Sequence, residues 1–280
     1  METITVIEPR TSSVAACFSE AWRSRAMVGF LALQFLKGLY RNTRLGALWL
    51  LIRPLIPAFV TALVFGRIAK IESGSLPYVI FIFSGMSVWN IFANSLRILT
   101  RSLKIGRSLI RNLYFPRVLV PVASSVFFLI EFSIYTVFLI FFIAYYGITT
   151  GTVYLKVGPG LLAAPLYLLT TVMLTLGIGF VTSILNTRAR DVRFSVPYGV
   201  NLVFFLTPVI YPLSLVPERW HTLVLLNPLA VAIDGYRWSL FGAGEFRPWA
   251  LLYALVTSGA VFLLGLRFFL KMESSLSDQL

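Results

Sequence analysis

Residues 118–146 read VLVPVASSVFFLIEFSIYTVFLIFFIAYY, a stretch whose only charged side chain is Glu131. As a helix it would be about 43 Å long, whereas about 20 apolar residues already cross the ~30 Å hydrocarbon core of a bilayer. The stretch therefore predicts a membrane-spanning helix, with enough length to tilt or to extend past the headgroups.

The composition of the whole chain agrees with a lipid environment. Hydrophobic residues make up 58% of the 280 residues and charged residues 12%, whereas a soluble domain carries about 25% charge to cover its surface. The chain has one cysteine, Cys17, and one histidine, His221. These counts exclude a disulfide framework within the chain and a metal site built on clusters of Cys and His.

Six segments are long and apolar enough to span the membrane. They are 45–65, 76–96, 118–146, 161–185, 196–215 and 249–270. We therefore predict an all-α integral membrane protein with six transmembrane helices. The expected organisation is a cytoplasmic N-terminus (1–44), a transmembrane domain (45–270) and a cytoplasmic tail (271–280). Within the N-terminal part, the apolar run at 26–36 is too short to cross and predicts an amphipathic helix in the membrane interface.

The positive charge of the chain follows the predicted topology. Lys and Arg number 24 against 11 Asp and Glu, a net charge of +13. Most of these basic residues lie before the first span, between the second and third, between the fourth and fifth, and after the sixth. Since positive charge gathers on the cytoplasmic side, both termini are expected there. Topology thus explains the charge without a nucleic-acid partner.

A basic segment at 100–112 follows the second span and has helical periodicity. Leu99, Leu103 and Ile110 share one face of a helix. The basic side chains on another face are Arg101, Lys104, Arg107 and Arg111. Such a helix either rests on anionic lipid or docks a soluble partner; Phe115-Pro116 would end it.

The segment 216–247 is apolar but cannot cross the membrane, because Asn227-Pro228 divides it into two short runs. Helices that enter a membrane and return need protein or a cavity around their ends. A pair of re-entrant helices capping a pore at its outer end fits this pattern, and a hairpin on the lipid surface is the alternative.

Two spans carry polar and aromatic side chains on one face. Tyr198, Asn201 and Phe205 share a face of the fifth span, and Trp49 and Arg53 share a face of the first. Aromatic rings beside an amide suit a wet path for sugars. Asn201 could equally form an interhelical hydrogen bond. Arg53 could pair with Glu131 or reach the cytoplasmic phosphates.

Known catalytic motifs are absent from the sequence. It has no G-x-x-x-x-G-K-[ST], no G-x-S-x-G, no H-E-x-x-H and no close pair of carboxylates. The densest polar cluster, 188–191, has no evident catalytic partner. We therefore expect no enzymatic activity, no cofactor and no metal in this chain.

Several short motifs occur in an order that resembles one family. They are Tyr40-Arg41-Asn42-Thr43-Arg44-Leu45-Gly46 with Trp49 and Pro54, Ile110-Arg111-Asn112 with Phe115-Pro116, Arg190-Asp191, Asn227-Pro228 and Tyr236-Arg237. The pattern, over about 36–270, is similar to permease subunits of ABC transporters that export polysaccharides such as O-antigen, capsule or teichoic acid. One departure is that Gln34, Phe35 and Leu36 stand where relatives often carry an acidic residue.

This resemblance implies a homodimer in the bacterial inner membrane, with two copies of a separate subunit that binds ATP and Mg²⁺. The substrate would be a lipid-diphosphate-linked glycan. Expected coupling residues are Arg101, Lys104, Arg107, Arg111, Arg190 and Asp191. Expected residues of the substrate channel are Trp49, Arg53, Tyr198, Asn201 and Phe205. Expected residues of the outer gate are Asn227, Pro228, Tyr236 and Arg237.

Three other functions remain open at this level. A permease of the same superfamily could export small molecules or drugs, for which a closed apolar vestibule is expected in place of a wide aromatic-lined path. A membrane enzyme acting on polyprenyl-linked sugars would need the missing paired carboxylates. A passive channel would need no cytoplasmic docking helix.

Overall fold

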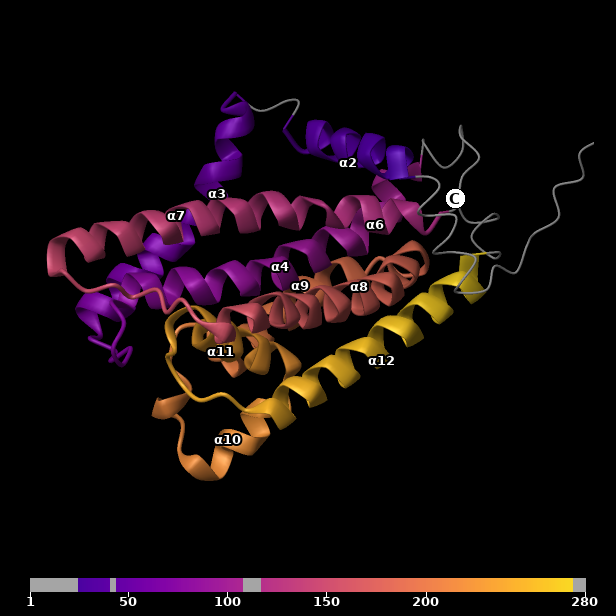
Figure 1. The fold of residues 1–280 in the computed structure, drawn as a ribbon. Helices are drawn as coiled ribbons and strands as arrows, with labels where there is room; N and C mark the ends of the chain where they lie inside the picture. Colours follow the sequence, from indigo (N-terminus) through magenta and orange to yellow (C-terminus); the bar gives the residue numbers. More distant parts are fainter. Residues whose placement is uncertain (1–24, 41–43, 108–116, 274–280) are drawn as a thin grey trace, which may run out of the picture.

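The computed structural model describes residues 25–40, 44–107 and 117–273, which form helices joined by short connections (Figure 1). The longer helices are α2 (Arg25–Tyr40), α3 (Trp49–Thr61), α4 (Tyr78–Ile105), α6 (Leu119–Ser125), α7 (Phe127–Thr150), α8 (Ala164–Arg188), α9 (Val192–Leu206), α10 (Glu218–Leu225), α11 (Pro228–Phe241) and α12 (Pro248–Glu273). The short elements are η1 (Gly46–Leu48), η2 (Ala62–Ile68), η3 (Pro159–Ala163) and η4 (Leu213–Leu215). No strand occurs in these ranges, so the predicted all-α class is confirmed for them.

Five helical segments are long and apolar enough to cross a membrane. They are Trp49–Ile68, Tyr78–Ile105, Leu119–Thr150, Pro159–Arg188 and Pro248–Glu273. Each coincides with one of the predicted spans 45–65, 76–96, 118–146, 161–185 and 249–270. Hydropathy alone therefore located five of the six predicted segments.

The remaining predicted span, 196–215, is not a single long helix. Helix α9 has 15 residues and ends at Leu206, so it is about 22 Å long at 1.5 Å per residue. Thr207 has extended backbone angles (φ −110°, ψ 135°) because a following proline, here Pro208, disfavours helix at the residue before it. The apolar sequence continues without helix until η4.

The predicted helix at 100–112 also differs in its described part. Residues 100–105 continue α4 without a break, and Gly106 follows as its C-terminal cap. The segment is therefore an extension of the second span up to that point. Residues 108–112 lie outside the described part of the chain.

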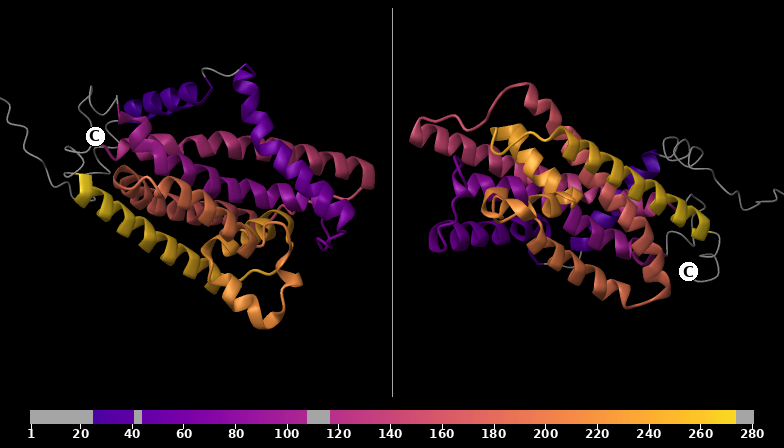
Figure 2. Two further views of the ribbon diagram at one scale, coloured as in Figure 1. Left: turned by 180° about the vertical axis from the view of Figure 1, so that it is seen from behind. Right: turned by 90° about the horizontal axis from the view of Figure 1, so that it is seen from below.

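Helix α4 is the centre of the bundle. It contacts α3, α6, α7, α8, α9 and α11, and 83% of its most apolar window is buried, against 17% for the segment Trp49–Ile68. Small residues on α4, such as Ser84, Gly85 and Ser87, let its neighbours approach closely. Figure 1 shows α3 and α12 on opposite sides of α4, and Figure 2 shows the same bundle from behind and from below.

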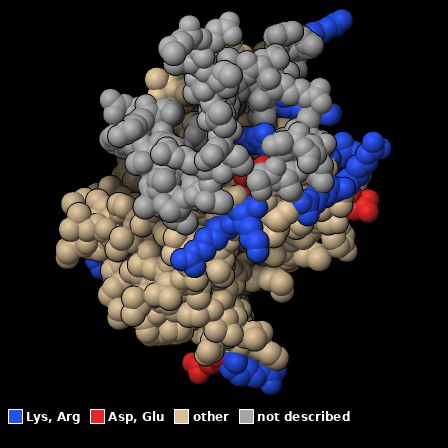
Figure 3. Space-filling view, turned by 90° about the vertical axis from the view of Figure 1, so that its right-hand side faces the viewer, with Lys and Arg blue, Asp and Glu red and all other residues tan. Residues whose placement is uncertain are grey.

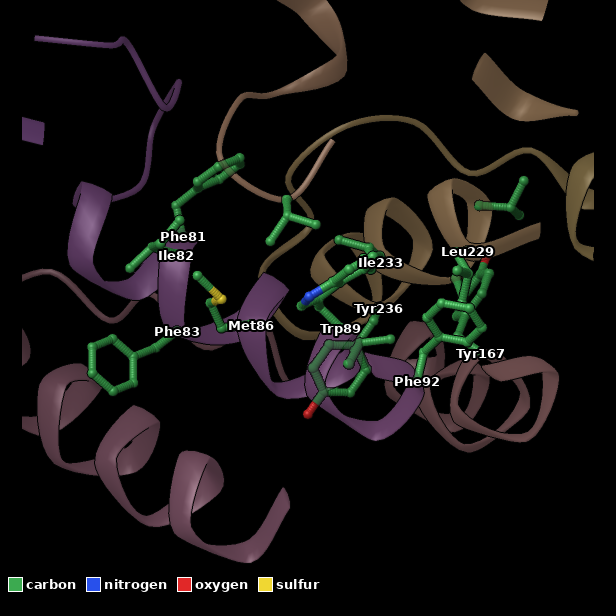
Figure 4. Packing of buried hydrophobic residues seen from close by; sticks show 14 of the residues in the cluster. Phe81, Ile82, Phe83, Met86, Trp89, Phe92, Tyr167, Leu229, Ile233 and Tyr236 are labelled. Atoms are coloured by element: carbon green, nitrogen blue, oxygen red, sulfur yellow. The ribbon is translucent and has the colours of Figure 1, made fainter. Parts of the chain in front are cut away.

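The main core lies between α4, α8 and α11. Trp89 and Phe92 of α4 lie near Ile233 of α11 and Tyr167 of α8 in Figure 4, whereas Phe83 lies on the other side of α4 and contacts Phe59 of α3 and Phe142 of α7. A second buried cluster lies at the other end of the bundle from Phe81, where α2, α4, α6, α8 and α12 meet. Its fully buried members include Leu31, Leu103, Leu119, Ile184 and Phe269. The predicted helix at 26–36 is thus present as part of α2, packed on α6.

Helices α8 and α12 cross at two glycines. A Cβ atom on Gly265 would overlap the carbonyl oxygen of Gly177, and a Cβ on Gly177 would lie 2.6 Å from the carbonyl carbon of Val261. This close approach is the small-residue packing that membrane helices use in place of hydrophobic burial.

Candidate functional site

A chain of hydrogen bonds links α3 to α4 and α7. The Tyr135 hydroxyl on α7 donates to the carbonyl oxygen of Pro54 on α3 (2.6 Å). Asn90 Nδ2 on α4 donates to the same hydroxyl (3.0 Å), and Asn94 Nδ2, one turn along α4, donates to Asn90 Oδ1 (3.0 Å).

The same chain continues to the buried carboxylate of α7 and to α9. Asn94 Nδ2 donates to Glu131 Oε2 (2.7 Å), while Arg97 Nη1 donates to Asn94 Oδ1 (3.2 Å). Arg97 Nη2 then donates to Asn201 Oδ1 of α9 (2.9 Å). We call Asn90, Asn94, Arg97, Glu131 and Asn201 the polar ladder. It ties α4 to both α7 and α9, and its Tyr135 contact reaches α3.

The possible ion pair between Arg53 and Glu131 is not formed. Among the described residues the two recorded ion pairs both involve Arg247. Glu131 is 3% exposed and takes its hydrogen bond from Asn94 instead. The possible interhelical bond of Asn201 does exist, with Arg97 as its donor.

The predicted channel residues lie on poorly covered faces. Tyr198 and Phe205 are 68% and 65% exposed, Arg53 and Asn201 are exposed, and Trp49 is half-buried. Helix α9 has its main contacts with α4 and fewer with α8, so its other face has no partner within the described part of this single chain. Tyr198, Asn201 and Phe205 are thus all exposed on α9, and Asn201 is also bonded to Arg97 of α4.

The predicted coupling residues gather at one end of the bundle. Arg101, Lys104 and Arg107 are exposed while Leu103 is buried, as the amphipathic pattern requires. Arg190 and Asp191, which follow α8, are exposed too. Figure 3 looks onto this end and shows Lys and Arg side chains gathered there. Arg111 lies outside the described residues.

Arg193 and Arg190 are close enough to Lys104 for their positive charges to repel its ammonium group. The end of α4 and the connection between α8 and α9 therefore form one positively charged surface. Like charges held side by side in this way favour an acidic partner surface.

The predicted outer gate contains the two short helices α10 and α11. Asn227 caps α11: its Oδ1 accepts from the Leu229 amide (3.0 Å), and its Nδ2 donates to Thr207 Oγ1 (2.9 Å). Pro228 occupies the first turn of the helix, where a proline loses no hydrogen bond.

Tyr236 and Arg237 are buried, at 4% and 2% exposure. Arg237 Nη1 donates to the carbonyl oxygen of Pro208 and Nη2 to that of Val209, both at 2.6 Å. Its guanidinium lies 3.6 Å from the centre of the Phe81 ring. Arg237 therefore holds the connection after α9 against α4, and it does so from inside the protein rather than at an outer surface.

A cavity of about 280 Å³ lies beside these helices. Its charged lining includes Asp234, Arg247 and Glu245. Arg247 pairs with Asp234 (3.7 Å) and Glu245 (2.8 Å). Burial raises the pKa of the Asp234 carboxyl, while the charges of Arg237 and Arg247 oppose that rise.

Three ladder residues, Asn90, Asn94 and Arg97, were missing from the sequence-based set. They stand one turn apart on α4, and polar side chains at this spacing within a span are a signal for a shared polar face. Gly85 was missed as well. Its importance comes from the close approach of Arg237, which no local pattern reveals.

Comparison with known proteins gives a consistent result. Residues 28–241 match the family model described as ABC-2 type transporter. Two proteins of Klebsiella pneumoniae named O-antigen export system permease protein RfbA are 26% identical over 238 residues, which is 85% of this chain and 88% of theirs. The RfbA protein of Myxococcus xanthus, with the same description, is 28% identical over 221 residues, 78% of this chain and 81% of its own.

The family match covers more than half of the chain, and it includes α4, α7, α9 and α11, the helices that carry the polar ladder and the buried arginine. The long apolar helices are those of a membrane protein. This chain belongs to the ABC-2 type transporter family and is a membrane permease of that family.

Proposed function

We propose that this chain is the membrane subunit of an ABC transporter that exports a lipid-linked polysaccharide across the bacterial inner membrane. ATP and Mg²⁺ are bound by a separate subunit. The relatives named as O-antigen export permeases support the substrate class. The observation that carries the proposal is the uncovered face of α9, where two exposed aromatic rings flank an amide. Such rings can stack on sugar faces while the path stays wet.

The proposed conduit lies between two copies of the chain related by a two-fold axis. Helices α3 and α9 line it, because they are the least covered helices beside α4. In this arrangement α9 and the extended segment after it make the sixth crossing, and both termini lie in the cytoplasm. Trp49 and Arg53 then face the same conduit as Tyr198, Asn201 and Phe205.

Transport is coupled to ATP hydrolysis at the positively charged end of the bundle. Two ATP-binding subunits dock there, one on each copy, against Arg101, Lys104 and Arg107 of α4 and its extension and against Arg190 and Asp191. When these subunits close on ATP, they pull on this end and tilt α3 and α9. A polymer is too long for an alternating cavity, so the path is continuous and the substrate advances in steps.

The outer end of the conduit is gated by α10 and α11. They form a short re-entrant pair whose apolar sequence suits a position at membrane depth. Asn227 and Pro228 set the angle between them, and Arg237 fixes α11 to α4 and to the end of α9. Tyr236 supports the gate from within the core.

The test is the double substitution Tyr198→Ala and Phe205→Ala in cells that make the glycan. We expect surface glycan to fall at least about tenfold, because stacking on each ring contributes on the order of 1 kcal/mol or more, while the amount of permease in the membrane stays unchanged. The matched control is Phe141→Ala on α7, a ring that is 57% exposed and lies on neither α3 nor α9. Unchanged surface glycan in the double variant, or altered drug resistance in its place, would contradict the proposal.

A further inference from the structure

Arg97 of α4 has more hydrogen-bonding capacity than its neighbours use. A guanidinium carries five N–H donors. Nη1 and Nη2 of Arg97 each donate once, to the amide oxygens Asn94 Oδ1 (3.2 Å) and Asn201 Oδ1 (2.9 Å). Both acceptors are neutral, so they orient the guanidinium without compensating its charge. Its remaining donors have no recorded acceptor in the described ranges and are available to a ligand.

Two more arginines lie beside it without a carboxylate of their own. Arg101 follows one turn later on the same face of α4 and is exposed. Arg53 is exposed on α3, next to Pro54, whose carbonyl is bonded to Tyr135 in the polar ladder. The charges of Arg53 and Arg101 both act on Arg97. Arg97 and Arg101 are thus neighbours on α4, and Arg53 lies on the helix that Tyr135 links to α4; we call the three arginines the arginine track.

One buried carboxylate is too little to neutralise this track. Glu131 acts electrostatically on Arg97, but it is held by Asn94 and forms no recorded ion pair with any of the three arginines in the described part of the chain. Three positive charges thus face at most one negative charge. Uncompensated charge at membrane depth is costly unless it meets water or an anion.

The track also has a direction. Along α4, Arg101 stands about 6 Å and Arg97 about 12 Å from the helix end at Ile105, at 1.5 Å per residue. The backbone at Arg53 lies deeper, because the carbonyl oxygen of its neighbour Pro54 is linked through Tyr135 to Asn90, about 22 Å from that end. The three side chains lead from the positively charged end of the bundle toward its middle.

From this arrangement we propose that Arg53, Arg97 and Arg101 bind the diphosphate group of the lipid-linked substrate and guide it into the conduit. The inference rests on the proposed function, which supplies a substrate of this class. Arginine suits the task because its planar fork bonds two phosphate oxygens at once. A diphosphate, with several oxygens and more than one negative charge, matches three adjacent arginines better than a single phosphodiester does. Asn94 and Asn201 are positioning residues, since they orient Arg97.

The test measures binding of geranylgeranyl diphosphate to the full-length permease in nanodiscs of neutral phosphatidylcholine. We expect Arg53→Gln and Arg97→Gln each to weaken binding about tenfold or more, since each removes a charge-assisted contact. Arg97→Lys keeps the charge and should retain part of the affinity. Higher salt should weaken binding to the wild type and have less effect on the variants.

The matched control is Arg267→Gln, which removes an exposed arginine from α12 and should leave affinity within about twofold. Thermal unfolding of each variant separates loss of fold from loss of binding. Arg53→Gln is the safer variant here, because no recorded hydrogen bond of the described residues depends on that side chain. Geranylgeranyl monophosphate and phosphatidylglycerol serve as competitors and should compete at least tenfold less well than the diphosphate.

Two results would overturn the assignment. The first is that the folded Arg53→Gln and Arg97→Gln variants bind geranylgeranyl diphosphate with wild-type affinity. The second is that phosphatidylglycerol competes as well as the diphosphate, which would mean that the arginine track binds ordinary lipid phosphate. Glycan export is scored separately with the permease gene deleted and restored. If deletion abolishes export while the arginine variants bind normally, the diphosphate site is wrong and the proposed function stands. If deletion leaves export intact, the proposed function fails whatever the binding result.

Discussion

Replacing Gly85 with alanine tests how strongly Arg237 holds α11 against α4 and the segment after α9. A Cβ atom at this position of α4 would overlap Arg237 Nη2 and would lie 3.1 Å from the carbonyl oxygen of Val209. The guanidinium cannot turn aside freely, because it is buried between α4, α11 and the segment after α9. The added methyl group must therefore push Arg237 away from the carbonyl oxygens that it holds.

The size of the effect follows from the bonds that are lost. Arg237 donates to Pro208 O and to Val209 O, both at 2.6 Å. A hydrogen bond to a charged group contributes about 1.5–3 kcal/mol, so losing both costs about 3–6 kcal/mol. Replacing Gly by Ala within a helix returns about 1 kcal/mol. The free energy of unfolding should therefore fall by about 2–5 kcal/mol.

The measurement is the thermal unfolding midpoint of the purified permease in detergent. A loss of this size lowers Tm by about 5 °C or more in a chain of this length. The control is Gly199→Ala on α9, where a Cβ meets nothing within 4 Å, so Tm should stay the same or rise slightly. Equal Tm values for the two variants would show that Arg237 can shift without losing its bonds, and the argument would be wrong.

Two further predictions concern other parts of the bundle. Gly265→Ala should lower the free energy of unfolding by about 1–3 kcal/mol, which would be measured as a lower Tm. The new methyl group would overlap the carbonyl oxygen of Gly177, and a backbone atom cannot move aside as a flexible side chain does. An unchanged Tm would mean that α8 and α12 separate at little cost. Changing Lys104 and Arg107 together to glutamate, which leaves Arg101 of the arginine track in place, should leave insertion and ATP hydrolysis intact but stop export, as measured by surface glycan, and unchanged export would rule out docking at this surface.

Much of the fold was predictable because hydropathy is a local property. A long run of apolar residues such as 118–146 favours a helix in lipid, because a helix satisfies its backbone hydrogen bonds within the segment itself. For the same reason hydropathy marked 196–215 as a span but did not show where its helix ends. That run is apolar throughout, but the backbone of Thr207 is extended before Pro208, and a hydropathy window does not register this change of conformation.

The candidate site was only partly predictable because its contacts join distant parts of the chain. The amphipathic pattern around Leu103 depends on one helix and was confirmed in its described part. The role of Arg237 depends on Phe81 and on the carbonyl oxygens of residues 208–209, and the pairing of Arg97 with Asn201 spans 104 positions. Sequence spacing carries no information about such pairs.

Helix α9 is attached to the rest of the molecule at two points of very different strength. In its middle, Asn201 accepts a hydrogen bond from Arg97 at a solvent-accessible position, where water competes for both groups and the net contribution is about 1 kcal/mol or less. At its C-terminal end, the carbonyl oxygens of Pro208 and Val209 are held by the buried guanidinium of Arg237, and Thr207 is bonded to Asn227. Any movement of α9 against α4 would therefore break the middle contact first and leave the C-terminal end in place. Since the middle contact is also the one that orients Arg97, the same movement would release the guanidinium at the centre of the arginine track.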